Sequence, residues 1–280
     1  MAPEKKTEPA KTPKQLAAEA RAASDAAEKR RERTIRIAGA AVVVLVVVGL
    51  LAVGFFAGRD KGNNSANPAP TADPNAATPA GVSSDTWGVK YGSGWTAADE
   101  AKLPTLELWE DFQCPGCASV EKSSGAQIQA LAKDGKVKLL YRPATFLDNS
   151  LAAENTANGN PNSSARASAA WGCAIDAGKT AEYHSGIFAM QPAKEGVGYS
   201  DQQLLDLAGR VGITGADLTT FNACVANGTY LSWSANSQEA FAKSGATATP
   251  TGYLNGVQLD GNQLSDTAGL AKMIADATAP

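Results

Sequence analysis

Two cysteines stand close together in the run Cys114-Pro115-Gly116-Cys117. Two thiols at this spacing on the first turn of a helix can form and break a disulfide reversibly. Free backbone N–H groups and the helix dipole stabilise an anion at the first position, so we expect Cys114 to be the nucleophile. Pro115 suits the first helical position because its missing N–H would have had no partner there. Cys117, one turn further in, is predicted to be the more buried, resolving thiol.

The other cysteines and the histidine do not extend this pattern. Cys173 and Cys224 do not repeat the Cys-x-x-Cys spacing, and the chain has a single histidine, His184. A zinc site needs about four such ligands at typical spacings, so we predict no metal and no cofactor. We interpret His184 as a packed helix residue. A permanent structural bridge in Cys114-Pro115-Gly116-Cys117 is the alternative to a redox centre.

The segments around the pair predict a strand, a helix and a second strand. Residues 103–112 are rich in aliphatic and aromatic side chains and suit a buried strand. Residues 118–134 carry a helical pattern that ends before Gly135, although Gly125 weakens it. Residues 137–141 read as a strand. The resulting βαβ unit places the cysteine pair at the start of its helix.

The second half of the domain predicts helices and then a hairpin. Residues 163–242 have helical periodicity with loop signals between the helices. Two short strands, at 252–254 and 257–259, flank the turn Asn255-Gly256, which is a strong hairpin signal. Residues 265–277 predict a closing helix.

The N-terminal part of the chain predicts a membrane anchor. Residues 1–36 contain ten Lys or Arg against six Asp or Glu, and residues 37–58 carry no charge. As a helix, the uncharged segment would span about 33 Å, enough to cross the bilayer once. The adjacent basic residues favour a cytoplasmic tail. A cleaved signal peptide is the alternative, but the apolar segment is long and lies far from Met1.

Residues 59–86 are rich in Pro, Ala, Asn and Ser and predict a flexible linker. The globular part would then lie outside the cytoplasm on a single-pass membrane anchor, where disulfides persist. A basic tail can also bind nucleic acid, but this tail directly precedes an apolar segment. We therefore expect the lipid bilayer, and not nucleic acid, to be its partner.

Three stretches of the sequence resemble the DsbA-like branch of the thioredoxin superfamily. These are WEDFQCPGC, EYHSGIFAMQPAKEGVGYSDQQLLDLA with FNAC behind it, and TPTGYLNG, in this order. The resemblance runs from residue 106 to the final helix. It implies an α/β thioredoxin-like fold over residues 87–280, with a helical insertion at about 150–243.

The resemblance also implies roles for individual residues. Thr249-Pro250 would be the cis-proline loop that faces the cysteine pair and holds the substrate strand. A threonine before this proline is similar to what disulfide isomerases carry. Many relatives have an acidic residue six positions before the first cysteine, where this chain has Leu108. Glu110 and Asp111 lie nearby, and we interpret them as solvated charges at a strand end.

Cys173 and Cys224 fall within the implied helical insertion. Outside the cytoplasm we expect them to form a structural disulfide. Two buried free thiols are the alternative.

The function that this resemblance implies is disulfide-bond formation in exported, cysteine-containing polypeptides. A membrane quinone-linked partner of the DsbB or vitamin-K-epoxide-reductase type would reoxidise the enzyme. Two alternatives remain open: a disulfide isomerase or reductase of the same fold, and a non-catalytic peptide-binding module.

Overall fold

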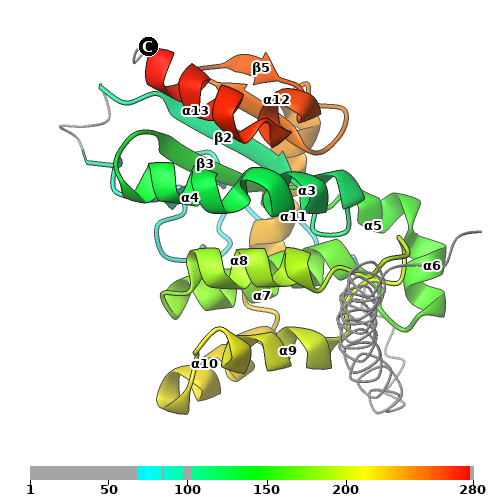
Figure 1. Ribbon diagram of the computed structural model, residues 1–280. Helices are drawn as coiled ribbons and strands as arrows, with labels where there is room; N and C mark the ends of the chain where they lie inside the picture. The colour runs from blue at the N-terminus through cyan, green and yellow to red at the C-terminus, as the bar shows by residue number, and fades with distance from the viewer. Residues whose placement is uncertain (1–68, 84, 97–101, 278–280) are drawn as a thin grey trace, which may run out of the picture. The chain divides into compact units, whose positions relative to one another are not determined.

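The computed structural model describes residues 69–83, 85–96 and 102–277. The predicted tail, the predicted membrane span and residues 59–68 of the predicted linker lie outside this part. Among the described residues, no helix combines the length and the apolar character needed to cross a membrane. Figure 1 shows two parts of the domain, a sheet with its covering helices and a group of helices beside it.

The sheet has five strands in the order β1-β3-β2-β4-β5. Their bounds are β1 Val89–Tyr91, β2 Thr105–Glu110, β3 Lys138–Pro143, β4 Thr251–Leu254 and β5 Val257–Leu259. β2 and β3 are parallel, and the other neighbouring pairs are antiparallel. A parallel pair needs a crossover connection, which here is the helical segment after the cysteine pair.

Local sequence signals account for the central strands and the hairpin. Every residue of β3 is buried, as expected for a strand covered on both faces. The hairpin pairs Leu254 with Val257, so Asn255 and Gly256 form a two-residue turn. Both turn residues have positive φ, 48° and 79°, which is the geometry that Asn-Gly favours. The predicted βαβ unit and hairpin are confirmed.

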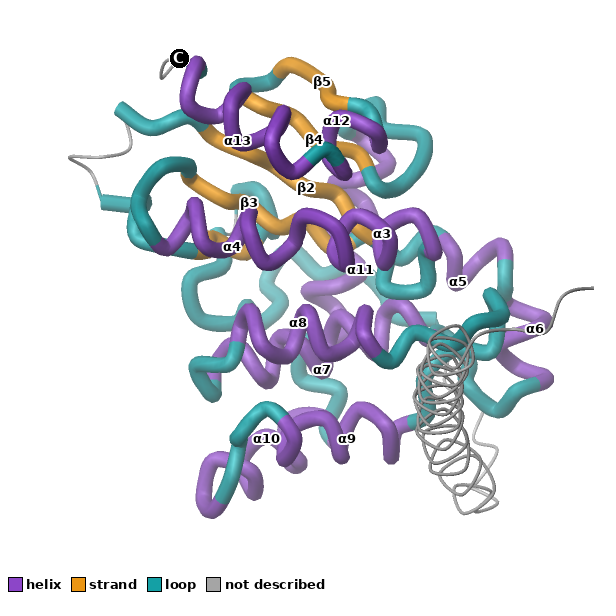
Figure 2. Tube along the Cα trace, in the orientation of Figure 1, coloured by secondary structure: helices purple, strands orange, loops and turns teal. Residues whose placement is uncertain are grey.

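Helices cover both faces of the sheet. On one face, α3 (Pro115–Val120), the π-helix η1 (Glu121–Gly125) and α4 (Ala126–Lys133) form one continuous segment. The C-terminal helices α12 (Gly261–Ser265) and α13 (Thr267–Asp276) lie beside it on the same face (Figure 2). α11 (Leu231–Lys243) lies behind the sheet, against β3.

The remaining helices lie in the region of the predicted helical insertion, which also includes α11. Their bounds are α5 Leu147–Ser150, α6 Ala152–Ala157, α7 Ser163–Asp176, α8 Thr180–Ala189, α9 Asp201–Arg210 and α10 Gly215–Ala226. α7 packs against α8, α10 and α11, so it connects the insertion to the helix behind the sheet.

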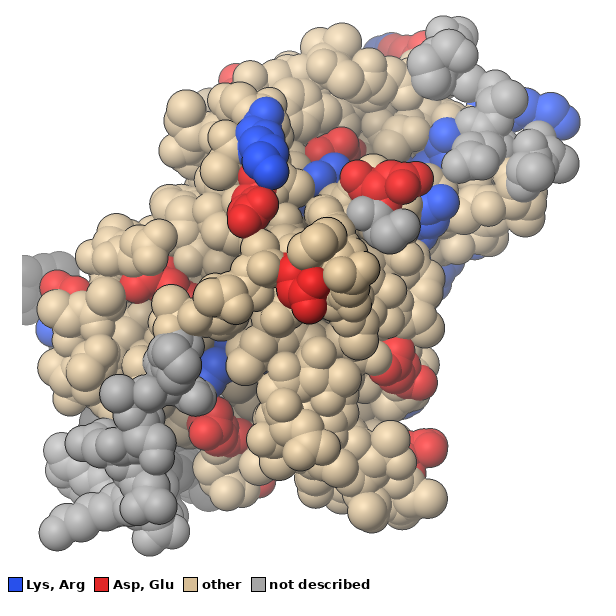
Figure 3. Space-filling view, turned by 180° about the vertical axis from the view of Figure 1, so that it is seen from behind, with Lys and Arg blue, Asp and Glu red and all other residues tan. Residues whose placement is uncertain are grey.

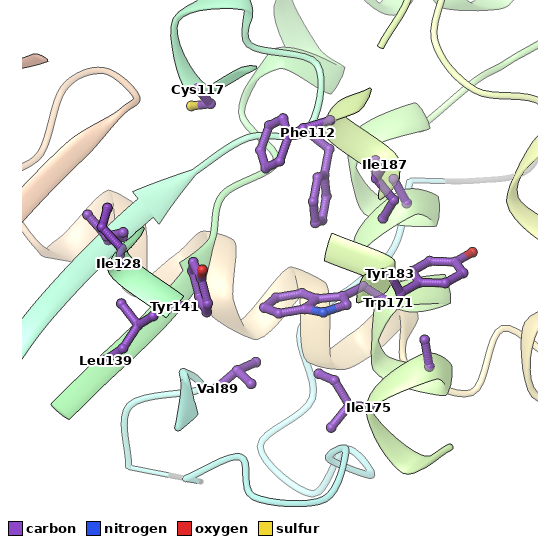
Figure 4. Packing of buried hydrophobic residues seen from close by; sticks show 14 of the residues in the cluster. Val89, Phe112, Cys117, Ile128, Leu139, Tyr141, Trp171, Ile175, Tyr183 and Ile187 are labelled. Atoms are coloured by element: carbon purple, nitrogen blue, oxygen red, sulfur yellow. The ribbon is translucent and has the colours of Figure 1, made fainter. Parts of the chain in front are cut away.

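One hydrophobic core runs through both parts. Phe112, just after β2, packs edge-on against Trp171 of α7 at 5.8 Å between ring centroids. Tyr141 of β3 meets the same indole at 5.9 Å. Cys117 belongs to this core and lies near Phe112 (Figure 4). Because the sheet and the insertion share these side chains, the insertion helps to position the loop before Cys114.

The predicted flexible linker needs correction at its C-terminal end. The side chain of Asn236, on α11, accepts a hydrogen bond from the backbone N–H of Asp73 and donates one to its carbonyl oxygen, at 2.9 and 2.6 Å. Asp176, at the end of α7, accepts from the N–H of Ala80 at 2.8 Å. Residues 69–83 lack large apolar side chains, so the sequence predicted no ordering by burial. Side chains of the domain order this segment through its backbone polar groups instead.

The surface opposite the view of Figure 1 carries scattered charges. Acidic and basic side chains appear singly or in small groups among larger uncharged areas (Figure 3). Val257 is the large apolar side chain that is exposed among the described residues, at 67 %. This face therefore offers neither a strong field of one sign nor a broad apolar patch.

Candidate active site

The cysteine pair lies where β2 leads into α3. Cys114 is the N-cap residue of α3 and has an extended backbone, with φ −76° and ψ 118°. Pro115 is the first helical residue, as the sequence predicts. Cys114 is 9 % exposed and Cys117 is fully buried. Both are free thiols in this structure, so Cys114 is the one that a substrate can reach.

The two thiols differ strongly in acidity. A hydrogen bond from the Cys117 thiol is the largest of the effects that lower the pKa of Cys114 to about 6. Burial acts in the opposite direction and raises this pKa. Thr249 and the backbone N–H groups of Cys117 and Gly116 lower it further. Burial raises the pKa of Cys117, and the hydrogen bond to Cys114 and the nearby charge of Glu110 raise it further. At neutral pH Cys114 is therefore a thiolate and Cys117 a thiol. This difference is what an attacking and a resolving cysteine require.

The cis-proline loop closes the site from the other side. The peptide bond between Thr249 and Pro250 is cis. The thiol of Cys114 lies 3.2 Å from the backbone carbonyl oxygen of Thr249. A Cβ atom at Gly116 would lie 3.1 Å from Cδ of Pro250, so the glycine permits the close approach of this loop to the helix. The structure thus brings together all four residues of the motif and the predicted loop.

Two side chains of the insertion hold the loop before Cys114. Gln191 donates hydrogen bonds to the carbonyl oxygens of Phe112 and Cys114, at 2.8 and 3.1 Å. The hydroxyl of Tyr199 donates to the same Phe112 oxygen at 2.6 Å. Both residues fall within the stretch that carried the family resemblance, but nothing in their local spacing pointed to these contacts.

Asp111 is not a solvated strand-end charge, contrary to the sequence interpretation. It is fully buried and accepts hydrogen bonds from Ser164 Oγ, Gln113 N and Leu147 N, at 2.6, 2.9 and 3.2 Å. The amide of Gln113 in turn binds Asn155 and Ser164. Buried polar groups need hydrogen-bond partners, and Asp111 and Gln113 find theirs on the inserted helices. This network therefore links the loop before Cys114 to the insertion.

Glu110 is likewise buried, at 5 % exposure, and this also corrects the sequence interpretation. Its Oε2 lies 3.2 Å from Nε2 of His184, whose Nδ1 lies 3.6 Å from Oε2 of Glu121. Burial raises the pKa of Glu110, and the charge of Cys114 adds to the shift. Leu108, at the position where relatives carry an acid, is a core side chain. The carboxyl group that affects the thiols comes from Glu110 instead.

A comparison with protein families decides where the chain belongs. The family model described as thioredoxin matches residues 97–276, which is more than half of the chain. The chain belongs to the thioredoxin family. A search of curated proteins found no match.

Solved thiol-disulfide oxidoreductases share this fold. MdbA, a thiol-disulfide oxidoreductase from Actinomyces oris, has a TM-score of 0.56 and 23% identity, over 74% of this chain and 96% of that one. The reduced disulfide bond oxidoreductase DsbG from Mycobacterium tuberculosis has a TM-score of 0.52 and 25% identity, over 68% of this chain and 84% of that one. Oxidised BdbD from Bacillus subtilis has a TM-score of 0.53 and 20% identity, over 71% of this chain and 95% of that one. The predicted resemblance to DsbA-like oxidoreductases of the thioredoxin superfamily is confirmed.

Within this thioredoxin-family domain, Cys173 and Cys224 form a disulfide that joins α7 to α10. The bond lies in the insertion, away from the loop that carries Cys114. The structure thus pairs the same two residues that the sequence analysis expected to pair, and it leaves the other two cysteines free to react.

Proposed function

We propose that the chain is an extracytoplasmic thiol-disulfide oxidoreductase that introduces disulfide bonds into exported, cysteine-containing polypeptides. The observation that carries the proposal is the Cys114 sulfur, which has a pKa of about 6 at the start of α3 and touches the cis-proline loop. A low pKa stabilises the reduced form and therefore favours oxidation of the substrate.

The reaction proceeds by two exchanges from the oxidised enzyme. A substrate thiolate attacks Sγ of Cys114, the Cys114–Cys117 bond breaks, and its electron pair goes to Sγ of Cys117, which takes a proton. A second substrate thiolate then attacks the substrate sulfur of the mixed disulfide, and Cys114 leaves as a thiolate. Two substrate thiols are thereby oxidised to one disulfide, while the enzyme gains two electrons.

A buried carboxyl group acts electrostatically on the Cys117 thiol. Glu110 is the carboxyl group whose charge acts on the Cys117 thiol, and burial raises the pKa of Glu110 so that it holds a proton more readily. We assign to Glu110 the role of proton donor when Cys117 leaves, and of acceptor when Cys117 attacks a mixed disulfide. Its position, four residues before Cys114, differs from the position used by many relatives.

The cis-proline loop provides the substrate-binding surface in this proposal. The hydroxyl oxygen Oγ1 of Thr249 is buried, and among the described residues it makes no hydrogen bond of normal geometry. An extended peptide that pairs with the backbone before Pro250 places its cysteine beside Cys114. Thr249 and Pro250 thus serve as the substrate-binding residues, with Pro115 and Gly116 shaping the motif.

The proposed location follows from the N-terminal sequence. Residues 37–58 anchor the protein in the cell membrane as a single-pass helix, and the basic tail at residues 1–36 remains in the cytoplasm. Anchoring raises the local concentration of the domain near a membrane reoxidant. We propose a quinone-linked partner of the DsbB or vitamin-K-epoxide-reductase type, which takes the two electrons from reduced Cys114 and Cys117.

A disulfide isomerase or reductase is the second candidate. Thr249, before the cis-proline, is the residue type that isomerases carry, and DsbG is among the similar structures. Either enzyme acts from its reduced form, and a reductase would have a reduction potential near that of thioredoxin.

Two measurements on the full chain, purified in detergent, test the proposal. The oxidised protein should oxidise a reduced two-cysteine peptide with one peptide disulfide formed per chain. Its reduction potential against glutathione should lie between roughly −120 and −230 mV, on the oxidising side of thioredoxin at about −270 mV. A potential near that of thioredoxin, with no peptide oxidation, would favour the reductase instead.

A further inference from the structure

His184 connects two buried carboxyl groups that come from different elements. Its ring lies on α8, Glu110 ends β2, and Glu121 begins η1. Nε2 lies 3.2 Å from Glu110 and Nδ1 lies 3.6 Å from Glu121. All three residues are buried, at 2, 5 and 8 % exposure. The imidazole thus lies between the two carboxyl groups, and each ring nitrogen faces a different one.

The surroundings leave these groups few other partners. Apart from the contacts with the imidazole, the carboxylate oxygens of Glu110 and Glu121 have no hydrogen-bond partner among the described residues, and neither has Nδ1 of His184. Aromatic rings surround the imidazole: Phe112, Tyr141, Trp171 and Phe188. Each of these polar atoms therefore has another member of the trio as a close polar neighbour.

The other titratable and charged groups that face the trio belong to α3 and β3. Cys114 and Cys117 act on Glu110 from α3. Tyr141 of β3 packs its ring 4.3 Å from the imidazole. Arg142 lines a cavity of about 10 Å³ together with Glu110 and His184, but its guanidinium binds Glu107 at 3.1 Å. A cavity of this size holds at most about one water molecule.

Gly125 makes room for the Glu121 carboxyl. A Cβ atom at position 125 would lie 2.3 Å from Oε2 of Glu121 and 2.9 Å from its Cδ. The two residues are the first and last of the π-helix η1, a kind of local irregularity that often marks functional sites. The glycine that weakened the helix pattern in the sequence thus has a steric role at this carboxyl.

We propose that Glu121 and His184 are positioning residues that relay a proton to Cys117 through Glu110. This proposal rests on the proposed function. When the Cys114–Cys117 bond breaks, Glu110 gives its proton to Sγ of Cys117 and takes the Nε2 proton of His184. Nδ1 then takes the proton of Glu121. After the three transfers Cys117 is a thiol, and Glu110 and His184 are again neutral. Glu121 is ionised, and it carries the negative charge that entered with the substrate thiolate.

A bound cation explains the geometry less well. The three side chains present oxygen and nitrogen atoms within 4.8 Å of one another. However, a single ion would use one imidazole nitrogen, whereas here each nitrogen faces a different carboxyl group. A relay uses both nitrogens.

The relay is tested by the rate at which oxidised full-length protein forms its mixed disulfide with glutathione, from pH 5 to pH 9. The rate constant is expressed per glutathione thiolate. In the wild type it should fall above pH 8, because burial raises the pKa of Glu121 to about 8 and the proton source is lost above that value. His184→Gln and Glu121→Gln should slow the reaction roughly tenfold below pH 8 and flatten this profile.

Two matched pairs of variants separate the relay from a structural role. Gly125→Ala displaces the Glu121 carboxyl and should reproduce the Glu121→Gln profile, whereas Gly209→Ala, where a Cβ meets nothing within 4 Å, should match the wild type. Glu182→Gln changes an exposed carboxyl on α8, the helix of His184, and should also match the wild type.

The outcomes distinguish the two proposals. If the wild type reacts but His184→Gln, Glu121→Gln and Gly125→Ala all keep its pH profile within about twofold, the relay is wrong and the proposed function stands. If the wild type neither reacts with glutathione nor oxidises the peptide, the proposed function itself fails. Should His184→Gln not fold, Glu121→Gln and Gly125→Ala still decide, since they alter a different element.

Discussion

The Sγ atom of Cys114 lies 3.2 Å from the backbone carbonyl oxygen of Thr249, although 135 positions separate the two residues. This contact joins the start of α3 to the loop before β4. It places the reactive sulfur at the edge of a backbone segment with which an extended peptide can pair. The reactive sulfur and the proposed substrate-docking backbone are therefore in direct contact.

The acidity of Cys114 should depend on Cys117. Alkylation of the reduced protein between pH 4 and pH 10 should report a pKa of about 6 for Cys114. Because the hydrogen bond from Cys117 is the largest cause of this shift, Cys117→Ala should raise the pKa toward the usual thiol value of 9.0. An unchanged pKa in that variant would assign the shift to the helix terminus instead.

The same shift predicts how pH affects the reduced form. The pKa of Cys114 in the folded protein is depressed, so the stabilisation of the reduced form is fully present above about pH 9 and is lost as pH falls through about 6. The reduced protein should therefore gain stability relative to the oxidised protein as pH rises over this window. Thermal unfolding of both forms across the window measures the difference.

Thr249→Ala should weaken peptide docking more than it alters the chemistry of the Cys114 thiol. The substitution leaves the carbonyl group that contacts Cys114 but removes the side-chain hydroxyl, which also helps to lower the pKa of Cys114. We expect KM for a peptide substrate to rise about three- to tenfold, as for one lost hydrogen bond, while the rate of reaction with glutathione, expressed per Cys114 thiolate, is unchanged. Equal losses for both substrates would contradict a docking role.

The disulfide between Cys173 and Cys224 should stabilise the fold but not take part in exchange. The two cysteines are separated by 51 positions, and closing a loop of this length in the unfolded chain is worth about 4 kcal/mol. The double variant Cys173→Ser, Cys224→Ser should lower Tm by roughly 8 to 16 °C. At low temperature it should still oxidise the peptide. Loss of activity in a variant that remains folded would give this pair a redox role.

Asn236→Ala should loosen the segment at residues 69–83 around Asp73, while Asp176 still holds Ala80. Both backbone groups of Asp73 lose their partner, and we expect a cost of about 1 to 2 kcal/mol in the free energy of unfolding. Hydrogen exchange at the N–H of Asp73 should accelerate. Asn222, an exposed residue of α10, provides the control, because Asn222→Ala should change neither quantity.

Local signals predicted the elements that carry the chemistry. Pro115 after a cysteine marked the start of the active-site helix, Asn255-Gly256 marked the hairpin, and glycines marked the ends of the inserted helices. Each of these signals acts within a few residues, so the sequence alone contains it. The order of the elements then followed from the family resemblance.

Long-range burial could not be predicted in the same way. Glu110 ends β2 and Asp111 follows it, at a strand end where charged residues are commonly solvated, but both are buried in the fold. The sequence shows only that His184 belongs to a helix. Its contact with Glu110 depends on how α8 is placed relative to the end of β2. The segment at residues 69–83 is ordered by side chains of α7 and α11 that come later in the chain. No local pattern encodes these contacts.

The central claim, that Cys114 exchanges disulfides with substrates and Cys117 resolves them, is tested most directly by trapping. Cys117→Ala cannot resolve a mixed disulfide, so its Cys114 thiolate should attack an oxidised substrate and remain attached to it. Covalent adducts should appear on non-reducing gels from cells that export cysteine-containing proteins, and they should vanish with reductant. The double variant Cys114→Ser, Cys117→Ala should give none. Adducts that persist in the double variant would show that another cysteine is the nucleophile and would contradict the account.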